Sequence, residues 1–153
     1  MSVHPYLFGR PYCYYDLTPV QNLVSTTYEI HSLMENIKLI IQIVIAIGIF
    51  NVWLLNFKKP SKYRGGNSQN MTEEFTAYGF NNWFMKLIGL LKLSLASLLI
   101  TGIWFPNLID ISAFLIGCLM IGAIGFHVKI NDPLIKSLPA FIMLVLSSIL
   151  IIL

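Results

Sequence analysis

Four long runs of apolar residues, separated by short polar segments, dominate this chain. The runs cover residues 37–57, 83–105, 109–128 and 133–153. A helix needs about 20 mostly apolar residues to cross the roughly 30 Å hydrocarbon layer of a membrane. The pattern therefore predicts an all-α membrane protein whose four transmembrane helices form a bundle.

The polar segment 58–82, between the first two runs, has a pattern of its own. A proline and a glycine pair break any helix in its first part. From Met71 to Phe80, aromatic residues alternate with polar ones, which is typical of a short helix lying at a membrane surface. We expect Thr72 to cap this interfacial helix, with Glu73 and Glu74 in its first turn.

Residues 1–34 differ from the rest, because they are rich in Tyr and Pro and contain no long apolar run. They also lack the charged start, apolar core and small-residue cleavage site of a signal peptide. We expect two parts: an N-terminal extension, 1–34, and a four-helix transmembrane domain, 35–153. Met34 stands immediately before the first run, so translation from that residue, with the extension untranslated, is an open alternative.

The composition agrees with a membrane protein and disfavours other classes. Of 153 residues, 56% are hydrophobic and only 11% are charged, whereas soluble domains carry about 25% charged residues. The net charge of +3 is small, and no Lys/Arg-rich face with interleaved aromatics indicates nucleic acid. The expected surroundings are a lipid bilayer.

The basic residues are distributed unequally between the two sides of the predicted bundle. The segments 58–82 and 129–132, with their flanks, hold Lys58, Lys59, Lys62, Arg64, Lys86, Lys129 and Lys136, and the other side holds Arg10 and Lys38. Positively charged loops resist translocation. We therefore expect a multi-pass protein of the cell (inner) membrane, with both segments cytoplasmic and both termini outside. The exposed run 58–64 would also contact anionic lipid.

Small residues recur at helical spacing within each apolar run. Because lipid tails compete with leucine, membrane helices associate through close packing at such faces. We expect a compact bundle, although the same faces could also mediate homo-oligomerisation. The faces are Gly48/Asn51, Gly89/Lys92/Ala96, Cys118/Gly122/Gly125 and Ala140/Met143/Ser147.

Lys92 is the most informative single position. It lies near mid-bilayer, about 13 Å from the start of its helix, where a charge costs about 2.5 kcal/mol or more. We expect it either to snorkel towards the interface or to meet a ligand or polar partner. Asn51, Cys118 and the Ile135 carbonyl that Pro139 leaves free lie at comparable depths.

His127, at the end of the third run, is the second candidate. A histidine near an interface can exchange protons, and Glu73 and Glu74 could meet it if the surface helix folds beneath the bundle. An interfacial anchor is the alternative role. No nucleophile–base set and no metal-ligand spacing occurs, so we predict neither a catalytic residue nor a metal site.

Two segments carry a resemblance to a known family. The stretch NMTEEFTAYGFNNWFMKLIGLLKL and the stretch MIGAIGFHVKINDPLIKSLPA resemble the surface-helix block and the third-to-fourth-span block of DoxX-like membrane proteins, over about residues 34–153. The resemblance implies a four-span bundle and a link to quinone-dependent sulfur oxidation or to oxidative-stress complexes. Some members carry an acidic residue where this chain has Lys92, so the chain departs from them there.

These observations suggest an accessory subunit of a membrane redox complex that binds quinone or lipid and docks a membrane or peripheral redox partner. In this hypothesis Lys92, with Asn51 beside it, donates to a quinone carbonyl, and His127 exchanges protons. Two alternatives remain open: a small solute carrier and a structural assembly factor without a ligand. The sequence does not decide whether the chain is an enzyme.

Overall fold

A computed structural model describes residues 18–153 of the chain. Its internal contacts divide the chain into two units, Met1–Leu33 and Met34–Leu153. Arg10, which the charge distribution assigns to the outer side, lies outside the described residues. The proposed extension, 1–34, stays a prediction.

The described part of the first unit is the beginning of helix α1 (Thr18–Phe50). Its hydroxyl side chains remain compatible with a helix because they bond backward to the preceding turn: Ser25 and Thr26 donate to the Asn22 carbonyl, and Thr27 donates to that of Leu23. The first membrane helix thus begins well before residue 37, where the apolar run starts.

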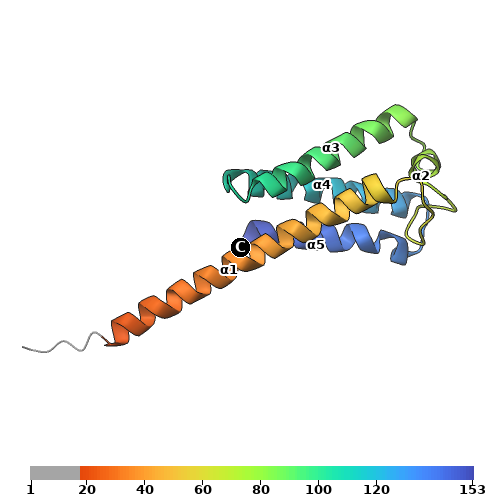
Figure 1. Ribbon diagram of the computed structural model, residues 1–153. Coiled ribbons are helices and arrows are strands. Elements are labelled where there is room, and N and C mark those ends of the chain that lie inside the picture. The colour runs from red at the N-terminus through yellow and green to blue at the C-terminus, as the bar shows by residue number, and fades with distance from the viewer. Residues whose placement is uncertain (1–17) are drawn as a thin grey trace, which may run out of the picture. The chain divides into compact units, whose positions relative to one another are not determined.

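The second unit contains the remaining helices. After α1 come the π-helical turn η1 (Asn51–Leu55), α2 (Met71–Ala77), α3 (Asn82–Thr101), α4 (Asn107–Lys129), the 3₁₀ turn η2 (Leu134–Ser137) and α5 (Leu138–Ile152). Residues 18–153 form no strand. Four helices are long and apolar enough to span a membrane, and the short α2 lies between the first two (Figure 1). The predicted fold class is confirmed.

The core of the second unit lies around α4, which packs against both α3 and α5. Close approach occurs where small residues face large ones: Gly48 faces the Met143 methyl group, and Gly89 faces the Trp53 indole. These contacts confirm packing at the predicted Gly48, Gly89 and Met143 positions. The largest fully enclosed side chains are Ile45, Leu99, Ile116, Leu150, Ser112 and Ser147.

The predicted packing face of α4 is wrong. Cys118 and Gly122 are exposed, and a Cβ at Gly122 or Gly125 would meet no atom of the neighbouring helices. The packed side instead carries Ser112, Ala113, Ile116, Gly117 and Met120. Because α4 is apolar on all sides, it has no polar face to mark its outward side, and residue size alone does not identify the packed one.

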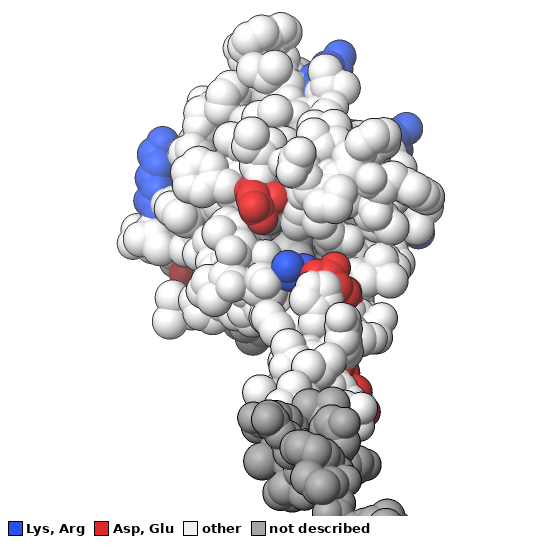
Figure 2. All heavy atoms as spheres, turned by 90° about the vertical axis from the view of Figure 1, so that its left-hand side faces the viewer, with Lys and Arg blue, Asp and Glu red and all other residues white. Residues whose placement is uncertain are grey.

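The surface agrees with a membrane environment. Large hydrophobic side chains such as Leu90, Ile111 and Phe114 are at least 60% exposed. On the face shown in Figure 2, most side chains are uncharged and the charged ones are few and scattered. So many exposed hydrophobic side chains need lipid or a protein partner to cover them.

Candidate functional site

Helix α2 is positioned by a cap that precedes it. The Asn70 side chain accepts from the Glu73 N–H at 3.0 Å, and Glu73 in turn accepts from the Gln69 N–H at 2.7 Å. The first bond satisfies one donor of the helix end, and the second fixes the residue that precedes the cap. The predicted cap, Thr72, is wrong, because Thr72 already lies inside the helix and its carbonyl accepts from Thr76. The expected place of Glu73 and Glu74 in the first turn is confirmed.

Helix α4 ends at a residue in the left-handed backbone conformation, Asn131, which turns the chain back toward the helix. Asn131 has φ 56°, a conformation that asparagine tolerates better than most residues. Its N–H donates to the Val128 carbonyl, and that of Asp132 donates to the His127 carbonyl at 3.0 Å. This is a Schellman motif, and it places the Asp132 carboxylate beside the His127 ring.

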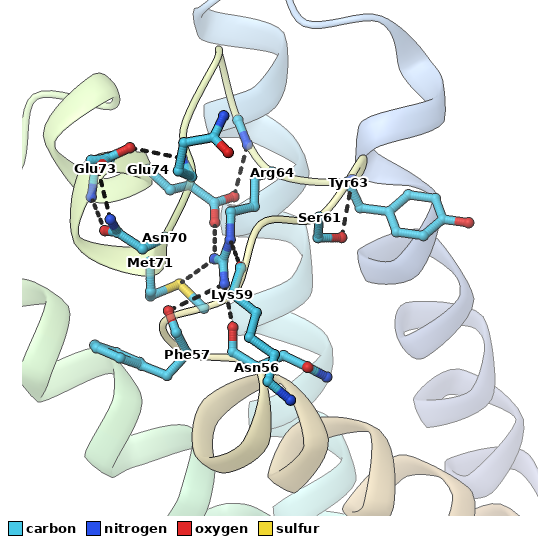
Figure 3. Close-up of polar contacts among 12 residues, drawn as sticks. Asn56, Phe57, Lys59, Ser61, Tyr63, Arg64, Asn70, Met71, Glu73 and Glu74 are labelled. Atoms are coloured by element: carbon cyan, nitrogen blue, oxygen red, sulfur yellow. Dashed lines mark hydrogen bonds and ion pairs between the residues drawn. The ribbon is translucent and has the colours of Figure 1, made fainter.

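Arg64 is buried, although it belongs to the basic run 58–64. Its guanidinium donates to Glu74 at 2.9 Å and to the carbonyls of Lys59 and Phe57 at 3.0 and 3.2 Å (Figure 3). It also donates to the Asn56 carbonyl. Arg64 therefore fastens the loop 56–70 to α2 and is not a solvated cation.

The glycine pair after Arg64 connects two buried carboxylates. The N–H of Gly65 donates to Glu74 at 3.0 Å, and the N–H of Gly66 donates to Asp132 at 3.1 Å. A side chain at Gly65 would collide with the Tyr78 hydroxyl, and Gly66 has φ 58°. Glycine is thus required at Gly65 by close approach and favoured at Gly66 by its backbone conformation.

Tyr78 and His127 connect these carboxylates. The Tyr78 hydroxyl lies 3.0 Å from Glu74 Oε1 and 3.2 Å from His127 Nε2, and His127 Nδ1 lies 2.9 Å from Asp132 Oδ2. Lys136 donates to Asp132 Oδ1 at 3.0 Å. Together Arg64, Glu74, Tyr78, His127, Asp132 and Lys136 are called the loop-end cluster. Of the two glutamates expected near His127, Glu74 reaches it through Tyr78. The bonds that Glu73 makes to residues 18–153 all lie within its own cap.

Burial and hydrogen bonding perturb two groups of this cluster. Burial, reinforced by the negative charge of Glu74, raises the pKa of Tyr78 far above its ordinary value, so the phenol keeps its proton. Burial acts to raise the pKa of Asp132 as well. There, however, hydrogen bonds from His127, Lys136 and Gly66 outweigh it and hold the pKa below the ordinary 3.8. Asp132 is therefore ionised at neutral pH.

A pH dependence follows from Asp132. Because its pKa is depressed in the folded state, it contributes stability that is fully present above the unfolded value and is lost as pH falls through the folded value. We expect the free energy of unfolding in detergent to decrease below about pH 4. The decrease should be shallower for Asp132→Asn than for the exposed control Asp110→Asn, measured by urea titration from pH 5 to pH 2. Parallel curves for the two variants would contradict this assignment.

A groove lies on the other side of α2, where η1, α2 and α3 meet. Its volume is about 440 Å³, and its walls are formed mainly by aromatic and aliphatic side chains, with a few polar side chains among them. The walls include Trp53, which the π-helical turn η1 carries against Gly89. Such turns often occur at functional sites. The lining residues are Trp53, Phe57, Thr72, Asn82, Met85, Lys86, Gly89, Leu90 and Leu93.

Lys92 lies next to this groove without lining it. Its side-chain nitrogen is 5.9 Å from the centre of the Trp53 ring, and within residues 18–153 it makes no hydrogen bond or ion pair. The suggested partners lie elsewhere. Asn51 is exposed and accepts from Asn56 at 2.9 Å, and Cys118 is exposed.

The third suggested partner of Lys92, the carbonyl of Ile135, is not free. It accepts from the N–H of Leu138, because the chain before Pro139 forms the 3₁₀ turn η2. Pro139 lies in the first turn of α5, where a missing N–H disrupts no helical hydrogen bond. The expectation of a free carbonyl at this depth is therefore wrong.

The sequence analysis predicted His127 and Glu74 as members of this site. It did not predict the other four members of the loop-end cluster, Arg64, Tyr78, Asp132 and Lys136. One signal in the sequence could have identified Asp132. The chain has only seven acidic residues, and Asp132 follows His127 closely. Within residues 18–153, no group of three His, Cys, Asp or Glu side chains is placed to hold a metal ion.

The fold and the distribution of side chains define an integral membrane protein built on a four-span helix bundle. Residues 64–150 match the model of the DoxX-like family, and the chain belongs to that family. The match covers the loop-end cluster and most of the groove. No curated protein and no solved structure matches the chain.

Proposed function

We propose that this protein is an accessory subunit of a quinone-linked membrane redox complex and that its groove holds the quinone head group. The observation that carries the proposal is the composition of the groove. Its volume falls within the range of small-molecule sites, about 300–1,000 Å³. A quinone ring is planar and can stack on Trp53 or Phe57. Its carbonyl oxygens accept hydrogen bonds, for which Lys86, Asn82 and Thr72 are donors.

The role of Lys92 changes in this proposal. Its amine lies 5.9 Å from the centre of the Trp53 ring and does not line the groove, so the proposal assigns it no hydrogen bond to the quinone. Leu90 and Leu93 extend the groove along α3, which suits the isoprenoid tail. We further propose that the protein lies in the cell (inner) membrane and that the end of the bundle with the loop 56–70 faces the cytoplasm. The exposed Lys58, Lys59 and Lys62 belong to that loop.

Quenching of Trp53 fluorescence by a short-chain ubiquinone tests the proposal. In a Trp83→Phe/Trp104→Phe background only Trp53 emits, and in a Trp53→Phe/Trp83→Phe background only Trp104 emits. We expect saturable quenching of Trp53 and only weak, linear quenching of Trp104 from quinone dissolved in the detergent. Lys86→Met should weaken binding about tenfold, the effect of losing one charge-assisted hydrogen bond, and the loop control Lys62→Met should not.

Equal, linear quenching at both tryptophans would reject a quinone site. Native mass spectrometry of the full chain, extracted from its own membrane in mild detergent, addresses the partner. An accessory subunit is expected to retain a redox subunit. A stable complex without quinone would favour a structural assembly factor, and an isolated chain that transports a solute into proteoliposomes would favour a carrier.

A further inference from the structure

Three polar side chains lie inside the apolar core of the bundle, each on a different helix. Gln42 of α1 is 2% exposed, Ser112 of α4 is 0% exposed and Ser147 of α5 is 1% exposed. Among the described residues, neither serine hydroxyl has a hydrogen-bond partner, and no group of residues 18–153 bonds to the Gln42 amide. Buried polar groups are nearly always hydrogen-bonded, so the three side chains need a partner that the rest of the bundle does not supply.

Other hydroxyl side chains of the membrane helices are satisfied within their own helix. Ser97, Thr101 and Ser148 each donate to the carbonyl four residues earlier, at 2.9 Å. This backward bond is a common alternative partner for a helical hydroxyl. Ser112 and Ser147 do not make it, although Ser147 directly precedes Ser148. Their hydroxyls are therefore available to a partner that lies between the helices.

Two contacts relate the three helices to one another along the bundle. Gly48 of α1 faces the Met143 side chain of α5, and Gly117 of α4 faces Ser147 of α5. Helix α5 runs in the opposite direction to both α1 and α4 (Figure 1). Positions that precede these glycines therefore lie on the same side of the contacts as positions that follow Met143.

The three polar side chains fall close to one level. Ser147 lies about 6 Å beyond the first contact, and Gln42 lies about 9 Å beyond it in the same direction, at 1.5 Å per residue. Ser112 lies about 7.5 Å beyond the second contact, which Ser147 itself makes. The Gln42 amide thus lies between the two hydroxyls. The hydroxyls are too far apart to bond to each other, since such bonds are about 2.7 Å long.

The helix contact beside Ser147 leaves room for a small group. A Cβ placed at Gly117 would lie 3.7 Å from Leu144 Cδ1 and 3.9 Å from Ser147 Cβ, which are ordinary contact distances. A group of about the size of a methyl therefore fits there without a collision. A water molecule is of similar size.

We propose that Gln42, Ser112 and Ser147 form a binding site for internal water, which connects α1 with α4 and α5. Each hydroxyl can donate and accept, and the amide supplies two donors and an acceptor. Water beside the amide thus finds the two to four polar partners that a buried water needs. The three side chains carry no charge, so the site suits a neutral donor and acceptor. None of them lines the groove.

Magnetic resonance that transfers polarisation from water to the protein tests this site in the full chain in lipid bilayers. With carbon-labelled serine, assigned through Ser112→Ala and Ser147→Ala, we expect both signals to grow several-fold faster than that of Ser148. Ser148 is the matched control, because it is adjacent but exposed and bonded within its own helix. Gly117→Ala fills the room beside Ser147 and should slow the Ser147 signal to the rate of the control.

The sign of a stability change gives an independent test. If Ser147 binds water, Ser147→Ala should lower the ratio of folded to unfolded chain about fivefold in mixed micelles, and Ser148→Ala should leave it unchanged. Removing a buried hydroxyl that has no partner at all would raise this ratio instead. The proposal is rejected if the Ser112 and Ser147 signals grow as slowly as that of Ser148, or if Ser147→Ala does not destabilise the chain. Neither readout involves quinone, so the two proposals can fail separately.

Discussion

Replacing Arg64 by methionine is expected to destabilise the folded chain by about 3–5 kcal/mol, the usual result of removing one partner from a buried ion pair. Arg64 is 6% exposed, and its guanidinium is bonded to Glu74 and to three backbone carbonyls. Methionine can replace much of its packing but none of its donors. Glu74 would then remain buried with a negative charge and no cation.

The measurement is the free energy of unfolding in mixed micelles, compared with the exposed neighbour Lys62→Met. We expect Lys62→Met to change stability by less than about 0.5 kcal/mol, as is usual for surface sites. Arg64→Lys should rescue little, since an ammonium cannot reproduce the fork of donors. Adding Glu74→Leu to Arg64→Met should recover part of the loss, because it removes the uncompensated charge. An Arg64→Met variant as stable as Lys62→Met would show that this pair does not hold the loop.

The membrane helices were predictable because their signal is local. Each apolar run is long enough to cross the bilayer, and the polar link between the first two runs contains its own short helix. The beginning of α1 was not predictable in this way, because residues 18–36 are less apolar and join the helix through continuity with the run that follows. The cap of α2 was misplaced by two residues, since Asn70 and Thr72 are both acceptable capping residues.

The packed face of α4 could not be read from residue size. Helices in lipid gain no hydrophobic benefit from turning one apolar side inward, so small residues can lie on either side. Cys118 and Gly122 face outward, while Gly117 packs against Leu144 and Ser147. In α3 the prediction succeeded because Lys92 marks the same side as Gly89 and Ala96, and a long polar side chain avoids lipid.

The loop-end cluster was only partly predictable, because its contacts join residues far apart in the chain. Gly66 and Asp132 are 66 residues apart, and no spacing rule connects a loop glycine with an aspartate after another helix. The meeting of Glu74 and His127 was anticipated as an outcome of α2 folding beneath the bundle. No pattern in the sequence indicated that Tyr78 lies between them, because it looked like one aromatic residue among several at a membrane surface.

Introducing one methyl group at Gly89 is expected to reduce stability by about 1–3 kcal/mol, the usual effect of overpacking. A Cβ at Gly89 would collide with the Trp53 indole, which is itself packed against Phe57 and Phe75 with ring centroids 6.2 and 6.1 Å apart. The indole therefore has to shift, and the aromatic wall of the groove shifts with it.

Gly122→Ala is the matched control, because a Cβ at Gly122 would meet no atom of the described part of the chain within 4 Å. There alanine should be neutral or stabilising by up to about 1 kcal/mol, since it only removes the helical penalty of glycine. Unfolding of both variants, followed by Trp53 emission in the Trp83→Phe/Trp104→Phe background, gives the comparison. Gly89→Ala should also weaken quinone quenching if the groove is the site. Equal stability of the two variants would mean that Trp53 does not pack on Gly89, and the groove would then lack the wall on which the function proposed for it depends.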